Sequence, residues 1–183
     1  MKRNSKRKDE ATAYHEAGHA VTNFELGRRM RKVTVIPTEG YLGACFDHKL
    51  LDSMADTYGD TPAVRKRVER EIMGKFAGKL AEDRFRGKNS KRPSRIDFNS
   101  ASAVAASMVS KEEQEPYLNW LYVRTKILIN RPETWRAIVA LAEELIRKKT
   151  LTGKEAYKIW EDIYKKESEV AAKEVQQIID RMH

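Results

Sequence analysis

Cysteine and long apolar runs are the features this sequence has least of. Among its 183 residues there is one cysteine, Cys45, so an intrachain disulfide is excluded. No apolar run approaches the roughly 18–20 residues needed to span a bilayer, which predicts that the chain has no transmembrane segment. The basic residues at its start are not followed by an apolar stretch, as they would be in a signal peptide. A single cysteine fits a reducing compartment, and we therefore expect a cytoplasmic protein.

Charged residues, by contrast, make up 34% of the chain, and the formal net charge is +9. An excess of basic residues can indicate binding to nucleic acid or to an anionic membrane surface. Here the basic residues are interleaved with Asp and Glu along most of the chain, a pattern more typical of solvated helix surfaces. Nucleic acid is therefore disfavoured as a partner. The densest basic run lies in residues 1–9, which we predict to be a flexible basic arm.

The apolar residues recur with helical spacing, and Leu, Ile, Ala, Glu, Lys and Arg dominate the composition. Both features predict a mainly α (α+β) fold. Two β-rich runs, residues 33–36 and 41–46, are predicted to form one short hairpin. The first predicted helix starts at Asp9 or Thr12 and stops at Gly27. Further helices are predicted over residues 61–85, 97–109, 110–130, 132–148 and 152–182.

The segment His15-Glu16-Ala17-Gly18-His19 reads as an HExxH motif. Positions i and i+4 lie on one face of a helix, so the two imidazoles can hold one Zn²⁺ from the same side, with Glu16 beside it as a general base. A random chain of this length would show the motif on the order of half a percent of the time, which favours a metal site. Gly18 costs a helix about 1 kcal/mol relative to Ala, which predicts that another backbone packs closely there.

A catalytic zinc usually has three protein ligands and one open position, so one ligand must come from elsewhere. Glu82 lies on a predicted helix and could be the third zinc ligand, a role that a Glu has in thermolysin-like enzymes. Those enzymes, however, place this ligand closer in sequence to the HExxH motif. Asp97 follows a basic loop and is explained equally well as the N-cap of the helix that it opens. The residues alone leave the choice open, with Asp97 ahead of Glu82. The candidates of suitable type after His19 are His48, Glu82, Asp83, Asp97 and His183, of which His183 is the poorest.

Residues 14–20, Tyr-His-Glu-Ala-Gly-His-Ala, resemble the zinc motif of the FtsH-type AAA+ proteases. Further segments that resemble this family follow in its order, at residues 33–43, 78–87, 96–102 and 141–151. The resemblance implies a helical zinc-metallopeptidase domain over residues 10–163, with a small β hairpin or sheet next to the HExxH helix, and a C-terminal helical extension over residues 164–183. It also implies that Zn²⁺ is held by His15, His19 and Asp97, with Glu82 as the alternative third ligand.

The sequence departs from this family in three respects. It contains no G-x-x-x-x-G-K-[ST] phosphate loop and no membrane anchor, and Ile96 stands where the family has an Asn before the ligand Asp. We therefore expect a stand-alone zinc metalloendopeptidase, ATP-independent on its own, that hydrolyses peptides or unfolded protein segments with metal-activated water. A separate ATPase subunit and an oligomeric state remain open. The residues expected to hold an extended substrate are Gly43, Ala44, Cys45 and Phe46.

A different class of protein is also compatible with these observations. A catalytically inactive zinc-binding module could bind nucleic acid or a protein partner through its basic surface, which includes residues 1–9 and 87–95. Glu16 argues against this interpretation, because a structural zinc site needs no general base.

Overall fold

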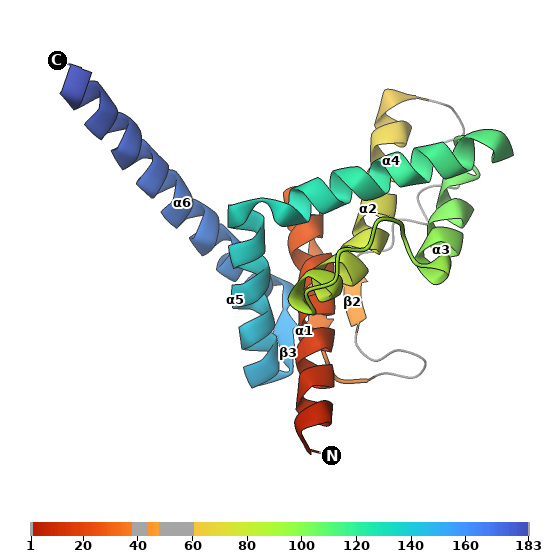
Figure 1. The fold of residues 1–183 in the computed structure, drawn as a ribbon, viewed down its shortest axis with the longest axis horizontal. Helices are drawn as coiled ribbons and strands as arrows, with labels where there is room; N and C mark the ends of the chain where they lie inside the picture. Colours follow the sequence, from red (N-terminus) through yellow and green to blue (C-terminus); the bar gives the residue numbers. More distant parts are fainter. Residues whose placement is uncertain (1, 38–43, 48–60, 183) are drawn as a thin grey trace.

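The computed structural model describes residues 2–37, 44–47 and 61–182, and for residues 2–8 and 44–47 it describes the backbone alone. Six helices and one small antiparallel sheet form the described part (Figure 1), which confirms the predicted mainly α fold. The helices are α1 (Lys2–Glu25), α2 (Pro62–Phe85), α3 (Arg95–Ala105), α4 (Lys111–Asn130), α5 (Pro132–Lys148) and α6 (Gly153–Met182). The strands are β1 (Met30–Thr34), β2 (Ala44–Asp47) and β3 (Thr150–Thr152).

Helix α1 lies at the centre of the domain and packs against both α2 and α5 (Figure 1). Its buried face carries small side chains, among them Ala13, Ala17 and Ala20, so that neighbouring helices can approach closely. A Cβ added at Gly18 would lie 2.5 Å from the Cβ of Ala81 and 2.8 Å from the carbonyl oxygen of Ala77. The predicted close packing at Gly18 is confirmed, and it holds the HExxH segment against α2.

The sheet has the strand order β2-β1-β3, and both pairings are antiparallel. The predicted hairpin is confirmed as β1 and β2, in which Val33 pairs with Cys45 and Thr34 with Ala44. β1 begins earlier than predicted, at Met30, and Ile36 lies beyond its end with 52% of its surface exposed. β3 was not predicted, because its three residues lie between two helices and pair with a strand more than 100 residues away.

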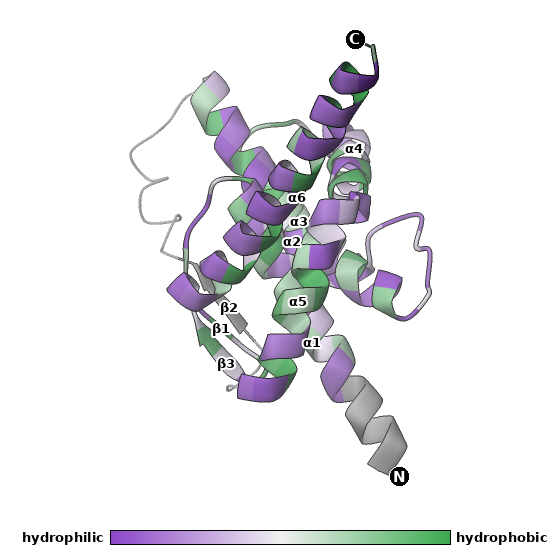
Figure 2. Cartoon of the chain, turned by 90° about the vertical axis from the view of Figure 1, so that its left-hand side faces the viewer, coloured by the Kyte–Doolittle hydropathy of each residue, from purple (hydrophilic) through white to green (hydrophobic). Residues whose placement is uncertain are grey.

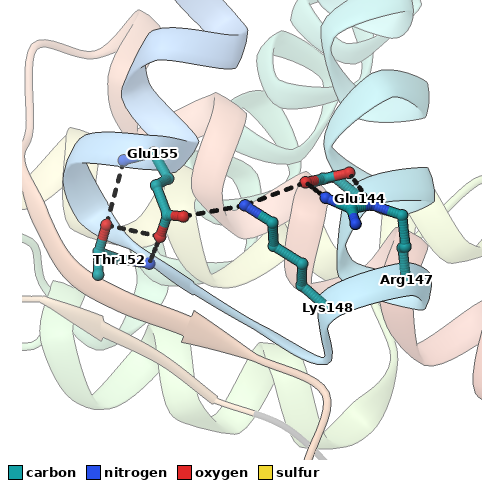
Figure 3. A network of polar contacts seen from close by, with 5 residues as sticks. All are labelled: Glu144, Arg147, Lys148, Thr152 and Glu155. Carbon is teal, nitrogen blue, oxygen red and sulfur yellow. Dashed lines mark hydrogen bonds and ion pairs between the residues drawn. The ribbon is translucent and has the colours of Figure 1, made fainter.

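Hydrogen bonds from capping residues fix several helix starts. Thr61 accepts a hydrogen bond from the Val64 N–H ahead of Pro62, and the Glu113 carboxylate accepts one from the Ser110 N–H. At α6, the Glu155 carboxylate accepts hydrogen bonds from the Thr152 N–H at 2.9 Å and from Lys148 at 3.0 Å (Figure 3). These contacts, that with the Thr152 backbone foremost, lower the pKa of Glu155 to about 2. The last turn of α5 and the first turn of α6 are thereby joined.

Two predicted helix starts were wrong. α1 begins at Lys2 rather than at Asp9 or Thr12, so that residues 2–9, predicted to be a flexible arm, continue this helix. The reason is that residues 2–11 contain no Pro or Gly and are rich in Lys and Arg, which favour helix. α3 begins at Arg95 rather than at Asp97, because Ser94 occupies the N-cap position and accepts a hydrogen bond from the Asp97 N–H.

The first half of α6 packs against β1, α5 and α1, and the second half extends away from the domain (Figure 1). The predicted end of this helix near Met182 is confirmed. None of the helices in the described residues is long and apolar enough to cross a membrane.

Candidate metal centre

His15 and His19 lie one turn apart on α1 and face α2. Their Nε2 atoms are 3.1 Å apart, and the two rings meet edge to face at 77°. Two nitrogens that bind one Zn²⁺ at about 2.0–2.1 Å with tetrahedral geometry lie about 3.3 Å from each other. The two Nε2 atoms therefore converge at a spacing that fits a shared metal ion.

Gly78 of α2 lies directly opposite this pair of rings. A Cβ at this position would lie 2.4 Å from Nε2 of His19 and 2.6 Å from Nε2 of His15, which is closer than real Cβ atoms approach other atoms. Glycine thus leaves the space in which the two imidazoles converge. Gly78 lies in one of the segments that resemble the FtsH-type family, but this role was not predicted from the sequence. The sequence feature that could have indicated it is a glycine in the middle of a predicted helix, because Gly lowers helix stability by about 1 kcal/mol relative to Ala.

The backbone of α2 fixes the tautomer of His19. Its Nδ1 lies 2.7 Å from the carbonyl oxygen of Gly74, which can only accept a hydrogen bond. The proton is therefore on Nδ1, and the Nε2 lone pair is free to bind a metal ion. Burial, aided by the nearby charge of His15, lowers the pKa of His19 to about 3. His19 is thus neutral near pH 7, which is the protonation state that a metal ligand requires.

A carboxylate lies at the other ring nitrogen of His15. Nδ1 of His15 is 3.4 Å from Oε2 of Glu82, and Oε1 of Glu82 accepts a hydrogen bond of 2.7 Å from Nε of Arg86. Contact with His15, followed by that with Arg86, lowers the pKa of Glu82 to about 2, so the carboxylate is ionised near pH 7. A carboxylate at the non-coordinating nitrogen of a histidine is a common outer partner of zinc sites, where it orients the ring.

Glu16 follows His15 on α1 and is 5% exposed. Burial raises its pKa to about 7, although the charge of His15 opposes part of the shift. A carboxyl group whose pKa is close to the working pH can both accept and return a proton. Glu16 therefore has the environment of a general base.

The structure does not bring Asp97 to the two histidines. Its Oδ2 accepts a hydrogen bond of 2.7 Å from the Ser94 hydroxyl, within the first turn of α3. Across residues 2–37, 44–47 and 61–182, no group of three or more His, Cys, Asp or Glu side chains is close enough together to hold a metal ion. α3 does pack against α2, the helix that also faces the histidines. The third ligand remains a prediction from the family resemblance.

The other candidate ligands lie elsewhere. Glu82 is at Nδ1 of His15 rather than at the converging Nε2 atoms. Asp83 is 2% exposed and is bound by Lys79 and by the hydroxyl of Ser90, so its carboxylate is already paired. His48 and His183 lie outside the described residues.

The predicted substrate-binding strand forms an edge of the described sheet. β2 contains Ala44, Cys45 and Phe46 and pairs with β1 on one side, and β1 separates it from β3. Gly43 lies outside the described residues. An edge strand offers backbone groups that can pair with an extended peptide.

Two neighbouring imidazoles and a buried glutamate on one helix, within a mainly α domain, form an arrangement typical of one class of protein, the zinc metalloproteases. The chain belongs to peptidase family M41, whose model matches residues 2–125. This membership confirms the resemblance to FtsH-type proteases.

The similar proteins include several named "ATP-dependent zinc metalloprotease FtsH". That of Haemophilus influenzae is 32% identical over 105 residues, which cover 56% of this chain and 15% of the relative. That of Borreliella burgdorferi is 28% identical over 79% of this chain and 28% of its own length. The one from Mycoplasmopsis pulmonis is 24% identical, and the match covers 94% of this chain and 26% of the relative. The chain thus spans between 15% and 28% of the length of these relatives.

Proposed function

We propose that this domain is a zinc metalloendopeptidase that hydrolyses peptides or unfolded protein segments and does so without ATP on its own. The observation that carries the proposal is the convergence of His15 and His19, with Nε2 atoms 3.1 Å apart, beside the buried Glu16. Membership of peptidase family M41 supports the same conclusion.

In this proposal His15, His19 and Asp97 hold the Zn²⁺ ion. The donor set suits zinc, because both histidines have a ring nitrogen directed to a common point and an acceptor near Nδ1. Asp97 is assigned by the family resemblance, and Glu82 is assigned to orienting His15. When bound, zinc supplies Lewis acidity, which lowers the pKa of a water molecule toward about 7 and polarises the scissile carbonyl.

Glu16 moves the protons of the reaction. Its carboxylate takes a proton from the attacking water and passes it to the nitrogen of the leaving amine. The ionised Glu82 and the Gly74 carbonyl keep the two histidine rings oriented while this happens. In this proposal the outer edge of β2 in the described sheet, with Ala44, Cys45 and Phe46, holds the substrate together with the preceding Gly43. The substrate is held in an extended conformation and adds a strand to the sheet.

The third ligand can be tested by measuring zinc content. Asp97→Ala should bind zinc far more weakly than the wild type, because one of three protein ligands is lost. Ser94→Ala is a matched control, since it removes the hydroxyl that contacts Asp97 at the start of α3 and leaves the carboxylate in place. If zinc content is unchanged in Asp97→Ala, Glu82 or His48 becomes the candidate instead.

The alternative function, an inactive zinc-binding module, predicts a different result. Wild type and Glu16→Gln would then be equally inert, while DNA or RNA binding would be tight and would weaken steeply with salt. Casein or a library of quenched peptides is a suitable substrate for the comparison, and the possible dependence on a separate ATPase subunit is tested by adding one.

A further inference from the structure

The second half of α6 has no packing partner within the described part of the chain. The helix is anchored as far as Glu167. Trp160 Nε1 donates to Glu25 at 2.9 Å, the Tyr164 hydroxyl lies 3.1 Å from that of Thr134, and Arg136 donates to Glu167. From Ser168 to Met182 every side chain is exposed, and the helix projects from the domain (Figure 1). An isolated helix of this length is only marginally stable in water, so packing against a further helix would stabilise it.

This half of α6 carries an apolar stripe. Figure 2 shows hydrophobic residues recurring along it between hydrophilic ones. Along the stripe, successive residues are alternately three and four positions apart, which is the spacing of a coiled-coil seam. The stripe lies on the same face of the helix as Tyr164, which contacts the domain. Val175 and Ile178 are each 56% exposed and Met182 is 79% exposed. The stripe consists of Ala171, Val175, Ile178 and Met182, preceded at the same spacing by the small residue Ser168.

The charges of this segment argue against a nucleic acid or a membrane. Residues 165–182 contain four basic residues and four acidic residues, so their net charge is zero. Helices that bind nucleic acid or lie on an anionic membrane carry an excess of Lys and Arg on the polar face. A neutral polar face beside a narrow apolar seam fits another helix of the same kind.

The order of residue sizes along the stripe indicates an antiparallel arrangement of two copies. Ser168 and Ala171 are small, and Val175 and Ile178 are large. In an antiparallel pair, small residues face large ones: Ser168 faces Ile178 of the second copy, and Ala171 faces Val175. The side chains then fill a similar volume at each position along the interface. A parallel pair would set the small residues against each other and leave gaps, which core packing disfavours.

The charges at the two ends of the segment favour the same arrangement. Glu167 lies near the start of the segment and Arg181 near its end. In an antiparallel pair, Glu167 of one copy therefore lies close to the oppositely charged Arg181 of the second copy. Glu167 already accepts a hydrogen bond of 2.5 Å from Arg136 of its own copy, and the second arginine would approach the same carboxylate. Glu174 meets its own counterpart near the two-fold axis, which limits the strength of the pair.

We propose that residues 168–182 pair with the same segment of a second copy of this chain as a two-fold symmetric, antiparallel helical coil. A two-fold interface uses the same surface on both copies, which a self-complementary stripe provides. The proposal is independent of the peptidase mechanism, because none of these residues belongs to the candidate metal centre.

Sedimentation equilibrium of the full chain tests the association. At about 100 µM the wild type should show twice the mass of the 21.1 kDa chain and dissociate on dilution. Val175→Glu combined with Ile178→Glu should remain monomeric, with the apparent dissociation constant raised at least about 10-fold. Val170→Glu is the matched control, because Val170 is 52% exposed but lies off the stripe, and it should behave as the wild type does.

Disulfide cross-linking tests the orientation, in a Cys45→Ser background that removes the natural thiol. Ser168→Cys mixed with Ile178→Cys should form cross-linked dimers, and Ser168→Cys alone should not. A wild type that stays monomeric, or an equal dimer in the double-Glu variant, would overturn the association. A cross-link formed by Ser168→Cys with itself would overturn the antiparallel arrangement.

Discussion

Replacing Gly78 with Ala should disrupt the metal centre, although it adds one methyl group to a helix that should otherwise gain from it. At an unobstructed mid-helix position, Gly→Ala stabilises a helix by about 1 kcal/mol. At Gly78 the new Cβ would lie 2.4 Å from Nε2 of His19 and 2.6 Å from Nε2 of His15. Ordinary contact distances are about 3.5 Å or more, so each ring must retreat by about 1 Å.

A displacement of about 1 Å is large on the scale of metal coordination, where ligand distances hold to about 0.2 Å. Gly78→Ala should therefore weaken zinc binding at least about 100-fold, which corresponds to roughly 2.7 kcal/mol. The measurement is a competition titration of zinc with a chelator, with circular dichroism to verify that the helices are intact.

Gly74→Ala serves as the control for the gain in helix propensity. It adds the same methyl group one turn earlier on α2, where the nearest atom is Oδ1 of Asn23 at 3.1 Å rather than a histidine ring. Gly74→Ala should retain most of its zinc affinity, because the Gly74 carbonyl that binds His19 is preserved. A Gly78→Ala protein with wild-type zinc affinity would refute the argument that the glycine makes room for the two rings.

Two other substitutions test the surroundings of the site. Glu82→Gln should lower zinc affinity about 10–100-fold without abolishing binding, because an outer partner of His15 loses its charge while the ligands remain; complete loss of zinc in the same competition titration would make Glu82 a ligand. Gly18→Ala should lower the free energy of unfolding by about 1–3 kcal/mol, because its Cβ would overlap that of Ala81. Urea denaturation measures this change, and an equal or higher midpoint would show that α1 and α2 can move apart at no cost.

The helices and the hairpin were predictable from the sequence because their signals are local. Thr61-Pro62 marks the start of α2, and Gly27, which adopts a positive φ of 72°, follows the end of α1. The start of α3 was misplaced because Asp97 is itself a favourable N-cap residue, and Ser94 three positions earlier looked like part of a loop. β3 offered no local signal, since its pairing with β1 depends on how α5 returns the chain to the sheet.

The site was predictable where its residues share one helix. The spacing of His15 and His19 places them on a common face of the helix. Gly18 between them predicted that another backbone packs closely there, and that backbone is α2. The acceptor for His19 is a backbone carbonyl, that of Gly74, and no side chain in the sequence reveals it. The role of Gly78 depends on the register between α1 and α2, which sequence periodicity does not determine. The sequence also placed Glu82 among the ligand candidates. In the structure Glu82 lies at Nδ1 of His15, which supports the orienting role proposed for it.

Peptide cleavage by Glu16→Gln beside the wild type, with zinc content measured on both proteins, tests the central claim most directly. The substitution keeps the shape of the side chain and removes its ability to accept a proton. The account predicts about one zinc per chain in both proteins, cleavage by the wild type, and a loss of at least about 100-fold in the variant, within the usual range for general-base catalysis. Undiminished cleavage by Glu16→Gln, or a wild type that binds zinc but cleaves no peptide, would contradict it.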